Sequence, residues 1–102
     1  MEQFNYREFY EHQVEWYKRD IEWNTKQIEY YTDQLQRSRK EDREFIEWVQ
    51  QNPNYTDREK VEMNRYVSNE TKQNLAHRKH YYLSRKRGRA NLAKYEKLLA
   101  DC

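Results

Sequence analysis

The feature that most constrains the fold is a long run of helix-compatible residues at the start of the chain. No Gly or Pro occurs between Met1 and Gln51, so nothing there forces the backbone out of a helix. Apolar residues recur in this run at alternating spacings of four and three, which is the heptad spacing of a helix packed along another helix. The pattern predicts one long helix over about residues 2–51 that needs a partner helix. Its seam positions are Tyr10, Val14, Tyr17, Ile21, Asn24, Ile28, Tyr31, Leu35, Ser38, Asp42, Phe45 and Val49.

Two of these seam positions, Ser38 and Asp42, carry polar side chains and mark the weakest part of the predicted helix. Ser38 and Glu41 also have the spacing of a capping box, from which a new helix can begin. The surrounding residues nevertheless have good helix propensity, and none of them forces a stop. We therefore expect a continuous helix with a local imperfection at this point.

The segment QNPNYTDRE is the clearest interruption in the chain. Pro53 has no amide hydrogen and disfavours helical conformation at Asn52. Thr56 and Glu59 have the spacing of a second capping box, which starts a new helix. A turn over about residues 52–56 is therefore expected.

The remainder of the chain, over about residues 57–100, again shows helical periodicity. Two long helices joined by a short loop pack most simply as antiparallel neighbours. The predicted fold class is therefore all-α, an antiparallel two-helix hairpin with long coiled-coil-like helices. The apolar face of the second helix consists of Met63, Val67, Asn74, Tyr81, Leu92, Tyr95 and Leu99.

Gly88, the only glycine in the chain, lies on this apolar face. A glycine inside a helix costs roughly 1 kcal/mol relative to alanine, so a structural gain should offset it. A close helix crossing, a kink, or a break near residue 88 into a short third helix each provides such a gain. The most common of these uses is close packing, here against a bulky aromatic side chain of the first helix.

The composition indicates a small domain with an unusual core. The 102 residues are enough for a single domain over residues 1–102. Only sixteen residues are Leu, Ile, Val or Phe, whereas Tyr occurs ten times and Trp three times. Rings bury large areas, and a net charge of +2 is too low to hold the chain open by self-repulsion. We expect a folded protein whose core is poor in aliphatic side chains and rich in rings.

A second row of aromatic side chains runs beside the seam of the first helix with a spacing of seven residues. We call Phe9, Trp16, Trp23 and Tyr30 the aromatic row. A hairpin offers each helix only one neighbour, so this row stays exposed unless another chain covers it. Self-association is therefore expected, most simply as a dimer that forms a four-helix bundle, and the aromatic row is the candidate partner or oligomer interface. A third helix folding back from Arg89 is an alternative cover.

Asn24 lies at a seam position between good core residues and has two interpretations. A buried polar side chain at such a position fixes the register and the number of partner helices at some cost in stability. Alternatively, Asn24 faces water at a ragged part of the seam. The sequence leaves both interpretations open because the opposing helix cannot be aligned from spacing alone.

Charge is distributed unevenly between the two halves of the chain. Residues 1–52 contain 8 Lys and Arg against 12 Asp and Glu, whereas residues 53–102 contain 12 against 6. Dense Lys and Arg suit a polyanion because neutralised phosphates release condensed counterions. Three interpretations remain: nucleic acid, an acidic protein partner, or a solvated face that pairs with the acidic first helix. The candidate binding residues are Arg78, Lys79, Arg85, Lys86, Arg87 and Arg89.

The aromatic row has a second conceivable use, which is stacking on unpaired bases. Glu8, Glu15, Glu22 and Glu29 follow the same spacing along the first helix and repel phosphate. The row is therefore expected to be a packing surface, and the basic segment is the better candidate for nucleic acid.

The sequence contains little that supports catalysis or metal binding. His77 and His80 have a helical spacing that suits a metal, but Arg78 and Lys79 between them oppose a bound cation. There is no glycine-rich phosphate loop, no nucleophile elbow and no Cys and His pairing with an orienting residue. We expect no enzymatic activity, no cofactor and no metal site.

The sequence also bears on location and on the kind of function. No stretch approaches the roughly 18 apolar residues of a membrane span, and the first residues lack the features of a secretory signal, so a cytoplasmic protein without membrane contact is expected. In scale and style the chain resembles small accessory or inhibitor proteins carried by phages and mobile elements. We expect a protein-interaction module that self-associates and docks on, or inhibits, a larger partner such as a nucleic-acid-handling complex. The alternative is a direct DNA- or RNA-binding protein that uses the basic second helix.

Overall fold

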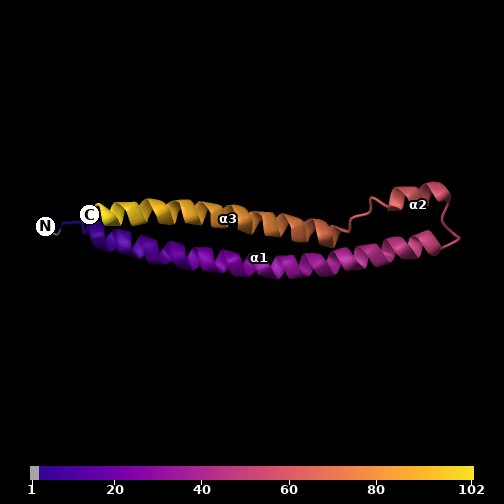
Figure 1. Cartoon of the computed structure of the whole chain (residues 1–102), viewed down its shortest axis with the longest axis horizontal. Coiled ribbons are helices and arrows are strands. Elements are labelled where there is room, and N and C mark those ends of the chain that lie inside the picture. Colours follow the sequence, from indigo (N-terminus) through magenta and orange to yellow (C-terminus); the bar gives the residue numbers. More distant parts are fainter. Residues whose placement is uncertain (1–2) are drawn as a thin grey trace. The chain divides into compact units, whose positions relative to one another are not determined.

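The computed structural model describes residues 3–102. This part of the chain contains three helices and no strand. The helices are α1 (Tyr6–Gln51), α2 (Asp57–Met63) and α3 (Asn69–Ala100). The long helices α1 and α3 run antiparallel and pack against each other (Figure 1). The all-α hairpin expected from the sequence is confirmed.

Helix α1 begins four residues later than the expected start near residue 2, and residues 1–2 lie outside the described residues. Asn5 caps the helix, because its side-chain oxygen accepts a hydrogen bond of 3.1 Å from the backbone N–H of Glu8. The helix is continuous through Ser38, as predicted. The Ser38 hydroxyl donates to the carbonyl of Leu35 in its own helix at 3.2 Å, so this residue needs no capping role.

The second half of the chain contains two helices, so the prediction of one helix over residues 57–100 was wrong. The predicted capping box at Thr56 and Glu59 does start a helix, but this helix ends at Met63. Successive hydrogen bonds form a turn at the end of this helix, including one of 2.9 Å from the N–H of Tyr66 to the carbonyl of Met63. Helix α3 then begins after Ser68, whose hydroxyl accepts from the N–H of Thr71 at 3.2 Å.

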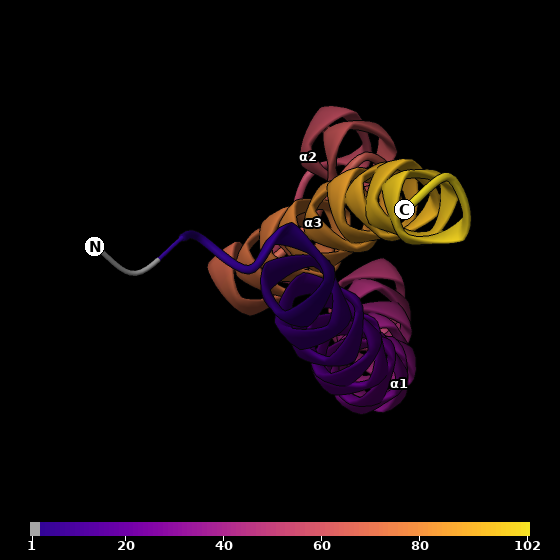
Figure 2. The same cartoon turned by 90° about the vertical axis from the view of Figure 1, so that its left-hand side faces the viewer.

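The contacts of the chain group it into two compact units, each of which contains part of α1 and part of α3. Unit 1 is Met1–Glu29 with Lys79–Cys102, and unit 2 is Tyr30–Arg78, which includes α2. The expectation of one domain over residues 1–102 stays a prediction. Unit 1 is seen end-on in Figure 2, where the first turns of α1 and the last turns of α3 lie side by side.

The interface of unit 1 is formed mainly by rings and by one close backbone approach. Val14 and Ile28 are its buried aliphatic residues. Tyr17 stacks on Tyr95, with ring centroids 5.8 Å apart and planes inclined by 15°. The ring of Tyr10 also approaches Tyr95, at 6.1 Å. These rings are only half-buried, and the buried hydrophobic side chains of the described residues are all aliphatic, so the expectation of a core rich in rings was wrong.

Gly88 makes the close approach in unit 1, and α3 continues through it without the break considered near residue 88. A Cβ atom at this position would lie 3.0 Å from the Asp20 carboxylate and 3.2 Å from Cγ1 of Ile21. The glycine therefore allows the two helices to approach closely. Its neighbours are an acidic and an aliphatic side chain. The suggestion that Gly88 packs against a bulky aromatic side chain was therefore wrong.

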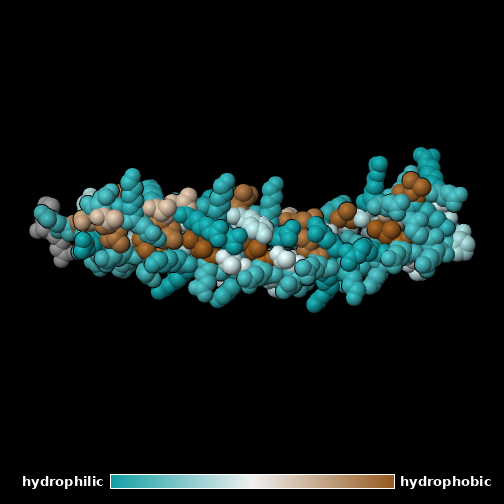
Figure 3. Space-filling view, viewed as in Figure 1, coloured by the Kyte–Doolittle hydropathy of each residue, from teal (hydrophilic) through white to brown (hydrophobic). Residues whose placement is uncertain are grey.

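The interface of unit 2 is mainly polar. Leu35 and Val49 are its buried aliphatic residues, and four polar residues are buried between them along the helix pair. Phe45 and Val67, which were expected in the seam, are exposed, because the chain at Val67 is not helical and leaves Phe45 without a facing helix. Figure 3 shows the hydrophobic side chains as short stretches separated by hydrophilic ones. The buried polar residues are Ser38, Asp42, Thr71 and Asn74.

Candidate interaction surfaces

The aromatic row lies on the exposed side of α1. In unit 1, Phe9, Trp16 and Trp23 expose 39%, 58% and 58% of their surface, while their seam neighbour Val14 is buried. Tyr30, which belongs to unit 2, is also exposed. Phe9 is the most covered of the four because its ring meets Tyr95 edge-on, with centroids 6.2 Å apart. Trp16 and Trp23 are therefore the most exposed members of the aromatic row.

Basic side chains, as well as glutamates, lie next to the aromatic row. Helical geometry places the residues three and four positions from each Trp beside its ring, and these include His12, Arg19 and Lys26. A surface depression of about 690 Å³ beside Trp16 is lined by both His12 and Arg19. Lys26 in turn pairs with Glu22 at 3.3 Å. The surroundings of the row thus carry both signs of charge, which suits packing against a protein surface.

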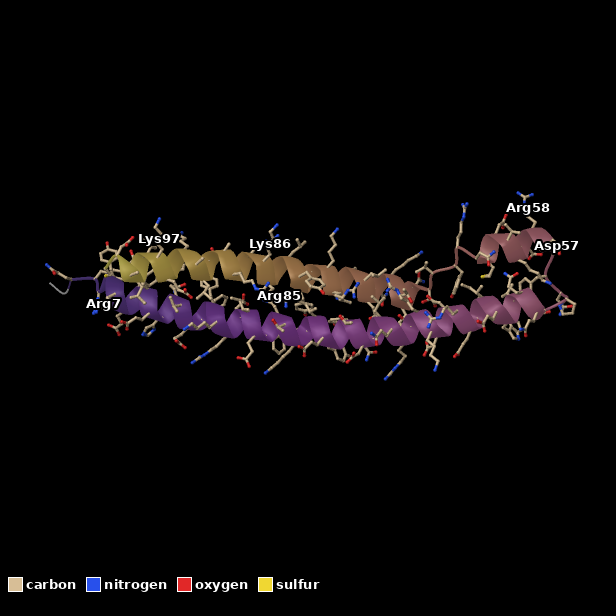
Figure 4. The ribbon with its side chains drawn as sticks, in the orientation of Figure 1. Arg7, Asp57, Arg58, Arg85, Lys86 and Lys97 are labelled. Atoms are coloured by element: carbon tan, nitrogen blue, oxygen red, sulfur yellow. The ribbon has the colours of Figure 1, made fainter. Side chains whose placement is uncertain are left out.

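Two of the six predicted basic binding residues lie in the helix interface instead of on the outer face. Arg85 is half-buried, and its guanidinium donates a 3.3 Å hydrogen bond to the hydroxyl of Thr25. The same guanidinium lies over the ring of Tyr82, 5.3 Å from the centroid. In Figure 4, Arg85 points toward α1, whereas Lys86 points away from it. Arg78, in unit 2, is half-buried as well.

The other four predicted basic residues, Lys79, Lys86, Arg87 and Arg89, are exposed on α3 in unit 1. Lys94 and Lys97 are exposed on the same part of the helix. Across residues 3–102, no ion pair joins any of these six side chains to a carboxylate. They therefore form a surface of uncompensated positive charge, which we call the α3 cation surface.

An exposed aromatic cluster in unit 2 was not predicted from the sequence. Phe45 stacks on Trp48 with centroids 6.0 Å apart, and it also contacts Tyr66 at 5.1 Å. Trp48 meets Tyr55 edge-on at 6.1 Å. The available signal was the position of these rings on both sides of Pro53, where a chain reversal brings neighbouring residues together.

The buried polar residues of unit 2 form two hydrogen-bonded groups, Asn74 with Ser38 and Thr71 with Asp42. The Asp42 carboxylate, 8% exposed, accepts hydrogen bonds from the hydroxyl of Thr71 at 2.7 Å and the N–H of Ser68 at 3.2 Å. Burial raises the pKa of this carboxyl, but the hydrogen bonds from Thr71 and Ser68 outweigh it, so that the pKa lies below the ordinary 3.8. Through its Oδ2 atom, the carboxylate thus holds the first residues of α3 against α1.

The two histidines considered for a metal site pack on tyrosines. His77 stacks on Tyr31 with centroids 4.9 Å apart, and His80 meets Tyr81 edge-on at 5.1 Å. Among residues 3–102 there is no group of three or more His, Cys, Asp or Glu side chains placed to hold a metal ion. Within the same residues, every buried side-chain nitrogen and oxygen has a hydrogen-bond partner.

Comparisons with known proteins give no relative: no family model matches the chain, and neither a curated protein nor a solved structure is similar to it. No helix in the described part of the chain has both the length and the apolar character needed to cross a bilayer.

Proposed function

We propose that this protein is a non-enzymatic helical interaction module that self-associates through the aromatic row of unit 1. In this proposal it docks on a larger protein partner, such as a nucleic-acid-handling complex, in the manner of small accessory or inhibitor proteins of phages and mobile elements. The observation that carries the proposal is the exposure of Trp16 and Trp23 beside a covered seam.

A second copy of the chain is the occupant that fits this surface best. Phe9, Trp16 and Trp23 recur every seven residues along a continuous helix, and a second helix is the natural complement to that spacing. In the described part of unit 1, Val14 and Ile28 are the buried aliphatic residues. Such a thin core gains substantially from burying exposed Trp rings against another copy.

The proposal is tested by measuring the mass of the protein in solution across a concentration series, by sedimentation or light scattering. The chain of 13.0 kDa should form a dimer at micromolar concentration. The double variant Trp16→Ser/Trp23→Ser should remain monomeric over the same range, because central Trp residues contribute about 2 kcal/mol or more each to an interface. Circular dichroism should show unchanged helix content, because both rings are exposed in the single chain.

Trp48→Ser is the matched control, since Trp48 is 54% exposed on the same helix but does not belong to the aromatic row. This variant should dimerise like the natural chain. A protein that is monomeric at every concentration contradicts self-association. Equal weakening by the two variants contradicts the role of the aromatic row.

The partner-binding half of the proposal has its own test. Affinity purification of the tagged protein from its native cells should recover a partner with the natural chain and with Trp48→Ser, but not with Trp16→Ser/Trp23→Ser. Recovery that does not depend on Trp16 and Trp23 removes the aromatic row from partner binding.

A further inference from the structure

The α3 cation surface is the strongest charge feature of the molecule, and it is independent of the aromatic row. The part of α3 in unit 1, Lys79–Cys102, contains seven Lys and Arg against two Asp and Glu. Unit 2 as a whole contains nine of each sign and unit 1 as a whole contains eleven Lys and Arg against nine Asp and Glu, so the excess belongs to this part of α3. Lys86 and Lys97 point away from α1 in Figure 4. An exposed surface of one sign without internal partners requires counterions or an anionic ligand.

Four of the six cations of this surface lie in two rows that run along α3. Lys79 and Lys86 form one row and Arg87 and Lys94 the other, and within each row the spacing of seven residues corresponds to about 10.5 Å. The rows are about 100° apart around the helix, since adjacent residues such as Lys86 and Arg87 differ by that angle.

A narrow ridge separates the two rows and faces away from α1. Helical spacing places Leu83 and Ala90 on this ridge, and both are exposed. Neither side chain has a hydrogen-bonding group. The outer face of α3 thus has an apolar ridge with cations on both flanks.

We propose that the outer face of α3 in unit 1 binds double-helical DNA. The helix lies in the major groove, which is about 12 Å wide and admits an α-helix. Lys79 and Lys86 contact phosphates on one side of the groove, and Arg87 and Lys94 contact those on the other. Because Leu83 and Ala90 offer the bases no hydrogen bonds, binding does not depend on sequence.

Two features favour a DNA duplex over other polyanions. A single strand is bound by successive stacked rings. The exposed rings beside these cations are those of Tyr82, one face of which is occupied by Arg85, and of His80, which meets Tyr81 edge-on. The major groove of an RNA duplex is too narrow to admit side chains readily.

The experiment measures binding of the full chain to a labelled DNA duplex by fluorescence anisotropy at several salt concentrations. One variant replaces the first row (Lys79→Gln/Lys86→Gln) and another replaces the second (Arg87→Gln/Lys94→Gln). Each should weaken duplex binding roughly a hundredfold at about 50 mM salt and lower the salt slope by about 1.8, since each phosphate contact adds about 0.9. Two duplexes of unrelated sequence should bind alike.

The matched control neutralises four exposed basic residues on α1 in unit 2, Arg37, Arg39, Lys40 and Arg43. It removes more charge than either row variant and should change duplex affinity less than either. Circular dichroism checks folding of all three variants, whose substituted side chains are all exposed.

Competition assays with an unlabelled single strand, an RNA duplex and polyglutamate identify the ligand class. Weak competition by all three supports the proposal. Equal or tighter binding of any of them overturns it, and so does the absence of duplex binding at low salt. If only one of the two row variants loses affinity, the helix contacts a single line of phosphates, and the proposal is overturned.

Discussion

The two units pair the same two helices by different chemistry. In unit 1, Tyr17 and Tyr95 stack and Gly88 lets the backbones approach closely. In unit 2, the carboxylate of Asp42 and the hydroxyl of Thr71 form a directional hydrogen bond across the interface. Ring contacts tolerate small displacements, whereas such hydrogen bonds do not. Unit 2 therefore defines where α3 begins, while unit 1 combines a tolerant interface with exposed aromatic and cationic surfaces.

The substitution with the largest expected effect on stability is Gly88→Leu in unit 1. A Cβ atom added at Gly88 would lie 3.2 Å from Cγ1 of Ile21. A leucine should therefore force α1 and α3 apart and lower the free energy of unfolding by about 3 kcal/mol. Urea denaturation measures this change. Ala90→Leu, at an exposed position of the same helix, should have little effect. Equal effects of the two substitutions contradict a close contact at Gly88.

The next effect concerns the polar interface of unit 2. Asp42→Ala removes the acceptor for Thr71 and Ser68 and should cost about 2 kcal/mol at neutral pH. Because the folded pKa of Asp42 is lowered, its contribution is present above the unfolded value near 3.8 and is lost as the pH falls through the folded pKa. Urea denaturation at pH 7 and at progressively lower pH should show the gap between natural chain and variant closing. A gap that does not change with pH contradicts the role of the charged carboxylate.

A pair of identical substitutions separates the two interfaces further. Asn24 in unit 1 is 2% exposed and donates to the carbonyl of Asp20 in its own helix, at 2.9 Å. Asn74 in unit 2 is 8% exposed and donates across the interface to Ser38, at 3.4 Å. Asn24→Leu should therefore stabilise the protein by about 1 kcal/mol, and Asn74→Leu should destabilise it by about as much. Thermal unfolding of both variants gives the two signs, and equal signs contradict the distinction.

The smallest effect is confined to α2. Thr56→Ala removes the helix cap and should reduce hydrogen-exchange protection of the α2 amides roughly fivefold. Amides in unit 1, such as those near Trp23, should exchange as before. A loss of protection that extends into unit 1 indicates that the two units unfold together.

The helix pair was predictable because it depends on local periodicity. Heptad spacing identified Val14 and Leu35 as buried, and Pro53 identified the turn. The break between α2 and α3 was not predictable, because no Gly or Pro marks it. It is stabilised instead by the Asp42 carboxylate, which lies 26 residues from Ser68 in the sequence.

The candidate surfaces were predictable to different degrees. The exposure of Trp16 and Trp23 follows from their spacing beside the seam. The inward position of Arg85 does not follow from its charge, because it depends on the hydroxyl of Thr25 and the ring of Tyr82. Its place in the heptad, three residues before Gly88, was the available signal.

The close contact at Gly88 also decides how α3 is aligned on α1. Heptad repeats are nearly unchanged when one helix slides by seven residues, so they allow several alignments of similar energy. Sliding α3 by one heptad brings Tyr81 or Tyr95 to the place of Gly88. Neither ring fits there, because even an added Cβ atom would lie 3.0 Å from the Asp20 carboxylate. The single residue without a side chain thus makes one of the repeated alignments distinct from the others.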